Sequence, residues 1–407
     1  MFWTQANHLH FDDNLRGDPL PTIAALHNLI EKQGYPDVVL DFAKTTRAFP
    51  EFVLPIVTAC RAYRQKKIDF DIRLPTDRRV ASLFVKSNWA HLIAPERFEI
   101  ATAAGTNHLA ATQFLTAEEH YSAVDSSIGL MLQLMPGVDR NRIKALEWAL
   151  NEITDNVLNH ANSPIGGIMQ VMTYPKLRRV EFYVSDAGLT IPRTLRQGRP
   201  EIHDDTTALR RAIEEGVTRN SETNQGNGLF GTFKCCEVSG GEFDVISGCV
   251  SLSHRPGQLQ VRRGNIPLGG TFVRAAIRYD FERLLETALV FKGRPHEPSY
   301  DFVERIYQKD GDEILFKIAA ELNAFGSREA GRMARTKIEN LMENGTAVIC
   351  FDFEDIRLIS SSFADEVFGK LFVNLGPLAF GRLCQFRNVD STVRGLIDRA
   401  IGQRMRI

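Results

Sequence analysis

The sequence predicts a multi-domain α/β protein, and three observations support this prediction. Short β-rich runs alternate with stretches of helical periodicity along the chain. Its 407 residues are enough for about two to four domains. Its 43% hydrophobic and 24% charged residues are ordinary values for globular proteins. We assign an N-terminal α/β domain to residues 1–105, a larger central domain to residues 113–282 and a C-terminal domain to residues 295–407.

Charge, termini and cysteines exclude several classes of protein. A formal net charge of −1 gives no direct evidence for a nucleic-acid partner or an anionic membrane surface. The N-terminus lacks the features of a signal peptide, and no run reaches the ~18–20 apolar residues that span a bilayer. We therefore expect a cytoplasmic protein without a membrane partner. Six scattered cysteines without a C-x-x-C pair are typical of reduced, mostly buried thiols.

The two ends of the chain contain a weak internal repeat. Residues 38–57 and 348–368 each read as an apolar strand ending in Asp-Phe, a loop of similar length, and a helix that begins near Phe52 or Phe363. This pattern indicates two copies of one small α/β unit on either side of a different middle domain. Residues 101–112 are small and polar, which is typical of a linker.

The middle domain begins with a long helical pattern over about 139–161. A segment rich in Gly, Thr, Asn and charge covers residues 186–231 and contains one helix, which Gly216 would end. Another helix begins at Gly228. The strands predicted in this domain are residues 166–174, 178–186, 242–248, 250–255 and 269–277.

Four polar or glycine-rich stretches follow one another in this domain. In "NEITDNVLNHA" (151–161), the residues Glu152, Asn156 and His160 form one polar stripe along a helix. "VSDAGLTIP" (184–192) ends an apolar strand in an acidic residue and a glycine. "NQGNGLFG" (224–231) and "GGTF" (269–272) complete the series. Taken singly, each stretch is equally typical of solvated helix residues, turns or ordinary strand residues.

Two common phosphate-binding motifs do not explain these stretches. "GNGLFG" matches G-x-G-x-x-G, but it follows a long polar segment, whereas a dinucleotide-binding fingerprint follows a strand. The chain contains no G-x-x-x-x-G-K-[ST], which excludes a P-loop.

Together, in this order and spacing, the four stretches resemble the GHKL superfamily of ATP-binding domains, which includes gyrase-type topoisomerases, Hsp90, MutL, histidine kinases and anti-sigma-factor serine kinases. The resemblance covers about residues 115–280. It implies a central α/β sandwich of the Bergerat fold, with ATP and Mg²⁺ as cofactors.

The resemblance also implies a role for each residue. Asn156 would ligate the Mg²⁺ that bridges the phosphates. Glu152 would orient or deprotonate an attacking water, or reach the metal through water, and would be the catalytic residue. His160 would lie near the phosphates or the lid.

The remaining roles concern adenine and the phosphates. Asp186 would accept a hydrogen bond from the adenine amine, Gly188 would let the backbone approach the base, and Thr271 would contact adenine directly or through water. Backbone amides at a helix start would hold the phosphates. The residues assigned to that start are Gly226, Gly228, Leu229 and Gly231.

One departure from the family pattern concerns the lid. The family usually has D-x-G-x-G, whereas this chain has Asp186-Ala-Gly188-Leu-Thr190, so the second glycine is missing. This puts the motion of the lid in doubt. The lid itself, about 190–225, is long and polar, as expected for a segment that orders over a nucleotide.

The C-terminal domain resembles STAS-like families, whose best-known members are anti-sigma-factor antagonists. In these antagonists a serine at a loop–helix junction is phosphorylated, and the matching position is Ser362. We favour a simpler interpretation, in which Ser362 and Asp365 form a capping box, because Ser360 replaces the usual acidic residue. The N-terminal copy has Phe49-Pro50-Glu51 there and no acceptor hydroxyl.

Three functions are compatible with this sequence. The first is an ATP- and Mg²⁺-binding regulatory switch, a slow ATPase whose nucleotide state gates the contacts of its STAS-like domains with each other or with a protein partner. The second is a serine kinase that phosphorylates Ser362 or a separate STAS partner. The third is a non-catalytic scaffold with a vestigial ATP site. A sensor histidine kinase is disfavoured, since no histidine has the context of a dimerisation helix.

Overall fold

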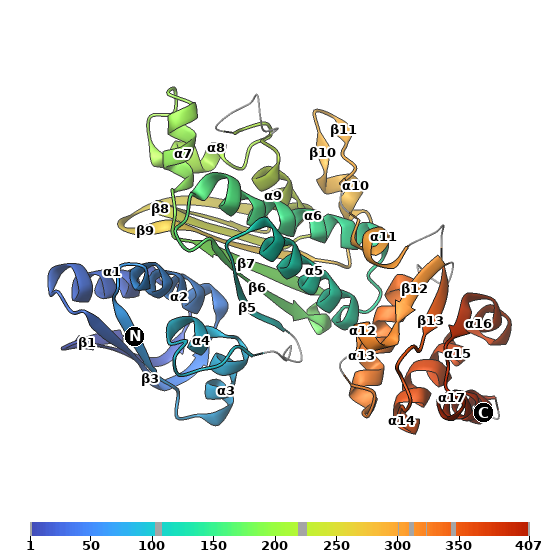
Figure 1. The fold of residues 1–407 in the computed structure, drawn as a ribbon. Helices are drawn as coiled ribbons and strands as arrows, with labels where there is room; N and C mark the ends of the chain where they lie inside the picture. Colours follow the sequence, from blue (N-terminus) through green and yellow to red (C-terminus); the bar gives the residue numbers. More distant parts are fainter. Residues whose placement is uncertain are drawn as a thin grey trace. The chain divides into compact units, whose positions relative to one another are not determined.

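The computed structural model describes residues 2–101, 108–218, 226–299, 301–308, 313–322, 324–342 and 347–405. The chain forms two compact units. The first contains Met1–Ser127 and Trp148–Glu297, and the second contains Ile128–Glu147 and Pro298–Ile407. Their sheets and helices confirm the predicted mixed α/β class (Figure 1). The division into three domains stays a prediction, because the first unit holds the N-terminal region and most of the central one.

The N-terminal region is a four-stranded sheet in the order β1-β2-β3-β4, in which β2, β3 and β4 are parallel. Strand alternation buries Val38, Leu40 and Phe42 of the central strand β3. Helix α2 begins at Pro50, because a first-turn proline lacks only an N–H that would be unpaired anyway. The elements are β1 Phe2–Gln5, β2 His8–Leu15, α1 Leu20–His27, β3 Asp37–Ala48, α2 Pro50–Arg64, β4 Asp69–Arg73, α3 Arg78–Lys86 and α4 Trp89–Ile93.

The central region is a five-stranded antiparallel sheet in the order β5-β6-β7-β9-β8. The strands predicted at 166–174 and 178–186 are confirmed as β6 and β7. The two predicted between 242 and 255 form one strand, β8, with an irregularity at Gly248. The elements are β5 His108–Phe114, α5 Ala117–Leu134, α6 Arg140–Asn156, β6 Gly167–Tyr174, β7 Arg179–Asp186, α7 Ile191–Gly198, α8 Asp205–Arg211, α9 Gly228–Val238, β8 Glu242–Arg255, β9 Gln258–Arg278, α10 Leu284–Ala288, β10 Val290–Phe291 and β11 Arg294–Pro295.

The linker predicted at 101–112 is wrong at its C-terminal end. Its last five residues, from His108, belong to strand β5, which pairs with β6. Ala111 and Phe114 of this strand are buried, so the small side chains that resemble a linker in the sequence fit a strand in a packed core. The segment 102–107 lies outside the described residues.

The two faces of the central sheet have different neighbours. Phe233 of α9 contacts Phe243 of β8, so Phe243 and its register partners face α9, and Figure 1 shows α5 and α6 running along the sheet. Tyr183 and Phe272 point to the opposite face, where they join the hydrophobic core of the N-terminal sheet. The indole N–H of Trp89 also donates to Gln170, 2.9 Å away. The N-terminal and central sheets therefore share one continuous core.

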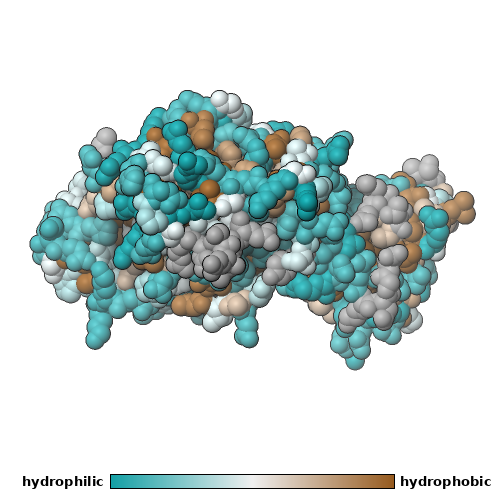
Figure 2. Space-filling model, turned by 90° about the horizontal axis from the view of Figure 1, so that it is seen from above, coloured by the Kyte–Doolittle hydropathy of each residue, from teal (hydrophilic) through white to brown (hydrophobic). Residues whose placement is uncertain are grey.

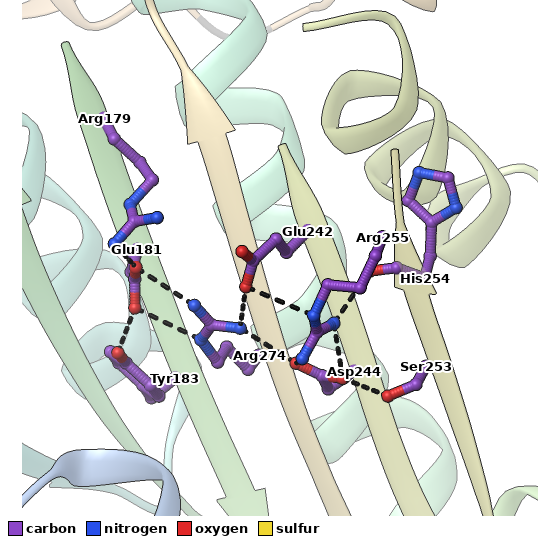
Figure 3. A network of polar contacts seen from close by, with 9 residues as sticks. All are labelled: Arg179, Glu181, Tyr183, Glu242, Asp244, Ser253, His254, Arg255 and Arg274. Atoms are coloured by element: carbon purple, nitrogen blue, oxygen red, sulfur yellow. Dashed lines mark hydrogen bonds and ion pairs between the residues drawn. The ribbon is translucent and has the colours of Figure 1, made fainter. Parts of the chain in front are cut away.

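A charge network lies on the face opposite α9 (Figure 3). Arg274 of β9 is bonded to Glu181 of β7 at 3.1 Å, and to Glu242 and Asp244 of β8 at 2.8 and 2.9 Å. The side chain of Glu181 is 2% exposed, and Arg179 bonds it from the other side at 2.8 Å. This network links three neighbouring strands through a single guanidinium.

The C-terminal unit contains a three-stranded parallel sheet in the order β12-β13-β14. Helices alternate with its strands, as the sequence predicts. The elements are α11 Phe302–Tyr307, β12 Glu313–Lys317, α12 Ile318–Glu321, α13 Arg328–Leu341, β13 Val348–Asp352, α14 Ser361–Ala364, a π-helical segment Asp365–Gly369, α15 Lys370–Leu375, α16 Pro377–Leu383, β14 Cys384–Arg387 and α17 Ser391–Arg404.

The internal repeat has a structural counterpart at the end of each central strand. Asp41 of β3 pairs in register with Arg73 of β4, and their side chains form an ion pair of 3.2 Å. Asp352 of β13 pairs in the same way with Arg387 of β14, at 3.0 Å. Both aspartates are buried, and each accepts a hydrogen bond from the backbone amide two residues later. The repeat therefore extends to side-chain contacts that the sequence pattern did not reveal.

Hydrophilic residues dominate the face drawn in Figure 2, and apolar ones form small separate patches there. In the part of the chain that the structure describes, no helix has both the length and the apolar character that a membrane span requires. All six cysteines are free thiols and five of them are buried, as predicted.

Candidate functional site

Helix α6 places Glu152 and Asn156 one turn apart, as predicted, with both side chains half-buried. The apolar residues Ile153 and Val157 are buried beside them. Directly after Asn156 the helix widens into a π-helical segment, Val157–Ala161, which contains His160. The predicted stripe of three polar residues on one α-helix is therefore interrupted before His160. Such π-helical turns often occur at functional sites.

Asp186 is the last residue of β7 and is buried, with 4% of its surface exposed. Strand alternation directs it to the α9 side of the sheet, opposite to Tyr183. Its Oδ1 accepts a hydrogen bond of 2.8 Å from the backbone amide of Gly188. Burial raises the pKa of Asp186 to about 7, although hydrogen bonds from the backbone of Gly188 and Thr271 oppose the shift. No cation among the described residues forms an ion pair with this carboxyl group.

Gly188 brings the end of β7 against the end of the π-helical segment. A Cβ at this position would overlap the carbonyl of Ala161. The next amide, that of Leu189, donates to the same carbonyl at 2.5 Å, and the amide of Ala187 donates to Ser163 Oγ at 3.2 Å. Gly188 is therefore needed for contact between two backbone segments. Ala161 and Ser163 belong to no distinctive motif, so their parts in this contact could not be predicted from the sequence.

Thr271 lies beside Asp186 on the neighbouring strand β9, in register with it. Its hydroxyl is 2.8 Å from that of Ser247 on β8, which is fully buried. Ser247 also accepts a hydrogen bond of 2.8 Å from the amide of Ile191, the first residue of α7. These contacts form a polar row across three strands and connect it to the start of the predicted lid. Ser247 could not be predicted as part of this row, because a lone serine in a β-rich run gives no signal.

Glu152 lies against the first residue of α9. A Cβ at Gly228 would overlap the Glu152 carboxylate, so only glycine lets this carboxylate approach the helix start. Burial, and secondarily the nearby charge of Asp155, raises the pKa of Glu152 to about 7. Backbone amides at the start of an α-helix have no partner within the helix. In α9 these include the amides of Gly228 and Leu229.

The other glycines of this stretch have structural roles. A Cβ at Gly231 would overlap the indole of Trp148 on α6, and its amide already donates to the carbonyl of Asn227 at 2.7 Å. The amide of Gly231 is thus used within α9, so this glycine contributes close helix packing rather than an anion contact. Gly226 has a positive φ of 71°, which favours glycine. The segment 219–225, which includes part of the predicted lid, lies outside the described residues.

The described residues contain no group of three or more His, Cys, Asp or Glu side chains that could hold a metal. A magnesium ion here would therefore need ligands from bound phosphates in addition to Asn156. The structure brings together Glu152 with the start of α9, and Asp186 with Thr271. Asn156 and His160 are positioned by α6 and the segment that follows it.

The predicted cap at Ser362 is wrong. Ser360 is the N-cap of α14, and its hydroxyl accepts a hydrogen bond of 3.0 Å from the amide of Phe363. The helix begins at Ser361, so Ser362 lies inside its first turn and its hydroxyl is 3.0 Å from that of Ser360. Asp365, the other half of the expected capping box, instead forms an ion pair with Arg404 at 2.9 Å. Ser362 is half-buried, and Ser361 is exposed.

Comparison with known proteins gives one family match. No curated protein matches the chain. A family model described as a STAS-like domain of unknown function (DUF4325) matches residues 330–394, which run from α13 to the start of α17. The C-terminal region thus contains a STAS-like domain, as the sequence analysis predicted for it.

Proposed function

We propose that this protein is an ATP- and Mg²⁺-binding regulatory switch and a slow ATPase, in which a GHKL-type domain, residues 113–282, gates the interactions of STAS-like units. One observation carries the proposal. Two carboxyl groups have pKa values raised to about 7: Asp186, at the end of β7, and Glu152, which lies on α6 against the start of α9. Carboxyl groups with strongly raised pKa values are over-represented at binding and catalytic sites.

The environment of Asp186 supports the recognition of adenine. Burying a carboxyl group without a cation is unfavourable, whereas a bound amine donor would compensate part of that cost. The hydroxyl of Thr271 lies in the adjacent register position and supplies a second polar group. Gly188 and Gly270 both pack directly on neighbouring backbone, because a Cβ at either would overlap backbone atoms. A bound base would be recognised here by the Asp186 carboxyl group and the Thr271 hydroxyl.

The surroundings of Glu152 support phosphate binding and water activation. The amides at the start of α9 are suited to phosphate oxygens, and Asn156 offers a carbonyl oxygen that Mg²⁺ accepts. Bound magnesium would supply charge neutralisation for the phosphates. A carboxylate with a pKa near 7 can take a proton from water at neutral pH, which is the role that we assign to Glu152.

The proposal includes the N-terminal region, residues 1–105, as a second STAS-like unit. Its strand-end pair of Asp41 and Arg73 has the same register and contacts as the pair of Asp352 and Arg387 in the region that matches the STAS-like family. We expect its partner to be a protein, or a second copy of the chain, which the nucleotide state would admit or exclude.

The test is calorimetric titration of the full-length protein with ATP, with and without Mg²⁺. We expect magnesium-dependent binding that Asn156→Ala and Asp186→Ala abolish. Asn159→Ala is the matched control, because Asn159 is an exposed asparagine three residues after Asn156 and donates a hydrogen bond of 3.0 Å to Asp155. Wild-type protein that binds no ATP would contradict the proposal and favour a scaffold with a vestigial site.

A serine kinase is the second candidate, and the position of Ser362 favours it. Because Ser360 caps α14, the hydroxyl of Ser362 is not needed as the cap and is available as an acceptor. Incubation with labelled ATP would then give an acid-stable phosphoserine that Ser362→Ala removes and Ser361→Ala retains. Release of inorganic phosphate without labelled protein would support the ATPase instead.

A further inference from the structure

Helix α6 is shared between the two compact units. Its residues up to Glu147 belong to the unit that contains the C-terminal domain, and its residues from Trp148 onward belong to the other. The helix is nevertheless continuous over 17 residues, from Arg140 to Asn156. Each half makes its own set of specific contacts.

The first half of α6 is fixed to the start of α11 by charged groups. Asp301, the N-cap of α11, bonds to Arg140 at 2.7 Å and to Lys144 at 2.8 Å, and only 10% of its side chain is exposed. Glu147, which is buried, accepts a hydrogen bond of 2.9 Å from the amide of Phe302. Charged hydrogen bonds with so little solvent exposure are stronger than those at the surface.

The connection that precedes α6 is fixed to α13. The side chain of Asn340 accepts hydrogen bonds from the amides of Gly137 and Val138, at 3.1 and 3.2 Å, and donates two of 2.8 Å to the carbonyls of Leu132 and Met135. These four bonds use the two donors and both acceptor positions of one amide group. Asn340 lies within the region that matches the STAS-like family.

The second half of α6 is interlocked with α9. Gly231 packs on Trp148, Gly228 packs on Glu152, and the Thr232 hydroxyl donates to the carbonyl of Ala149 at 3.3 Å. At 1.5 Å per residue, Glu147 and Glu152 are only about 7.5 Å apart along the helix axis. A displacement of one half of a regular helix over this distance moves the other half as well.

We propose that α6 couples the STAS-like C-terminal domain to the nucleotide site, with the Asp301 ion pairs as the connection. This inference rests on the proposed function. A nucleotide that engages Glu152 and Asn156 shifts α6, and the shift changes the contacts of Asp301 and Asn340. By thermodynamic linkage, a partner protein that alters the C-terminal domain changes the affinity for nucleotide by the same factor.

Hydrogen exchange of the full-length protein tests the coupling. In the wild type we expect Mg²⁺ and ATP to slow exchange in α11 and α13 by roughly fivefold or more, the lower range of allosteric coupling. Asp301→Asn removes the negative charge but keeps a good N-cap residue, so α11 should still form. In this variant the slowing in α11 and α13 should be lost. Asp390→Asn, the same change at the N-cap of α17, is the control and should behave as wild type.

Calorimetry on the same samples separates the two possible failures. If ATP binds and slows exchange around α9 but not in α11 and α13, the coupling is refuted and the nucleotide site stands. If Asp301→Asn keeps the full slowing, the ion pairs are not the connection and the proposal is overturned. If ATP does not bind, the nucleotide site and the coupling both fail.

Discussion

At the scale of single residues, burial of the Asp186 carboxyl group, which we propose binds adenine, has an energetic cost. Its pKa rises from 3.8 to about 7 on burial, so the folded protein binds more protons than the unfolded chain between these values. Stability therefore falls as the pH rises through this window. Asp186→Asn should raise the free energy of unfolding of the nucleotide-free protein, by about 2–3 kcal/mol more at pH 8 than at pH 5. Urea denaturation at both pH values measures this difference.

The same substitution should abolish ATP binding, because an asparagine at this position cannot offer the amine two carboxylate acceptors. Stability and binding would then change in opposite directions. An Asp186→Asn protein whose stability gain does not depend on pH would show that the carboxyl group is ionised at little cost.

Gly228 tests the contact between Glu152 and α9. Its φ is not in the positive range, so alanine fits the backbone, and the three atoms nearest to its Cβ would all belong to Glu152, with the carboxylate oxygen overlapping it. Gly228→Ala should destabilise the fold by about 1–3 kcal/mol through overpacking and should weaken ATP binding. Thermal unfolding and calorimetry measure the two effects.

A double substitution separates this clash from other causes. Adding Glu152→Ala should restore most of the stability lost in Gly228→Ala, because it removes the overlapping group. Gly395→Ala in α17 is the control, since a Cβ there meets nothing within 4 Å. Equal losses at both glycines would point to general helix effects instead of the specific contact.

At the scale of elements, the start of α14 depends on one hydroxyl. Ser360→Ala removes the acceptor for the amide of Phe363 and should cost about 1 kcal/mol of stability. Ser362→Ala should cost less, because Ser362 lies within the first turn. Chemical denaturation of the full-length variants measures both. A larger loss of stability for Ser362→Ala than for Ser360→Ala would show that Ser362 is the N-cap.

The stability of the central sheet depends on a single side chain as well, that of Arg274. Arg274→Met would leave Glu181, 2% exposed, with Arg179 as its remaining cation, and would leave Glu242 and Asp244 paired with Arg255 alone. Breaking one side of a buried charge network typically costs about 3–5 kcal/mol. We expect a loss in that range by urea denaturation. Arg278→Met, at an exposed pair with Asp280, is the control and should cost well under 1 kcal/mol, as surface ion pairs do.

The elements that could be predicted from the sequence are those whose signal is local. Strands β6 and β7 follow from β-rich runs, and Asp186 and Gly188 are neighbours in the chain. The contact of Gly228 with Glu152 was not predictable, because it depends on how α6 and α9 cross in space. The cap at Ser360 was missed because three consecutive serines satisfy the same pattern. The pairing of Asp41 with Arg73 required knowledge of strand register.

At the scale of the whole molecule, the shared core predicts that the N-terminal and central sheets unfold together. Buried residues of both sheets form one hydrophobic cluster, and Trp89 bonds to Gln170 inside it. A ligand that binds only the folded state at a concentration of 100 times its Kd stabilises that state by about 2.7 kcal/mol. If the two sheets unfold cooperatively, the ligand must stabilise strands β2–β4 by the same free energy as strands β6–β9.

Hydrogen exchange in increasing urea measures the free energy of opening of each strand. We expect β3 and β7 to open with the same free energy, and saturating ATP with Mg²⁺ to raise both by the same amount. Gln170→Leu, which leaves the buried indole N–H of Trp89 without its acceptor, should lower both together by about 1–3 kcal/mol. A ligand-induced gain confined to β7 would mean that the N-terminal sheet is an independent cooperative unit. Nucleotide binding could then affect the rest of the molecule through α6, but not through the hydrophobic core that the two sheets share.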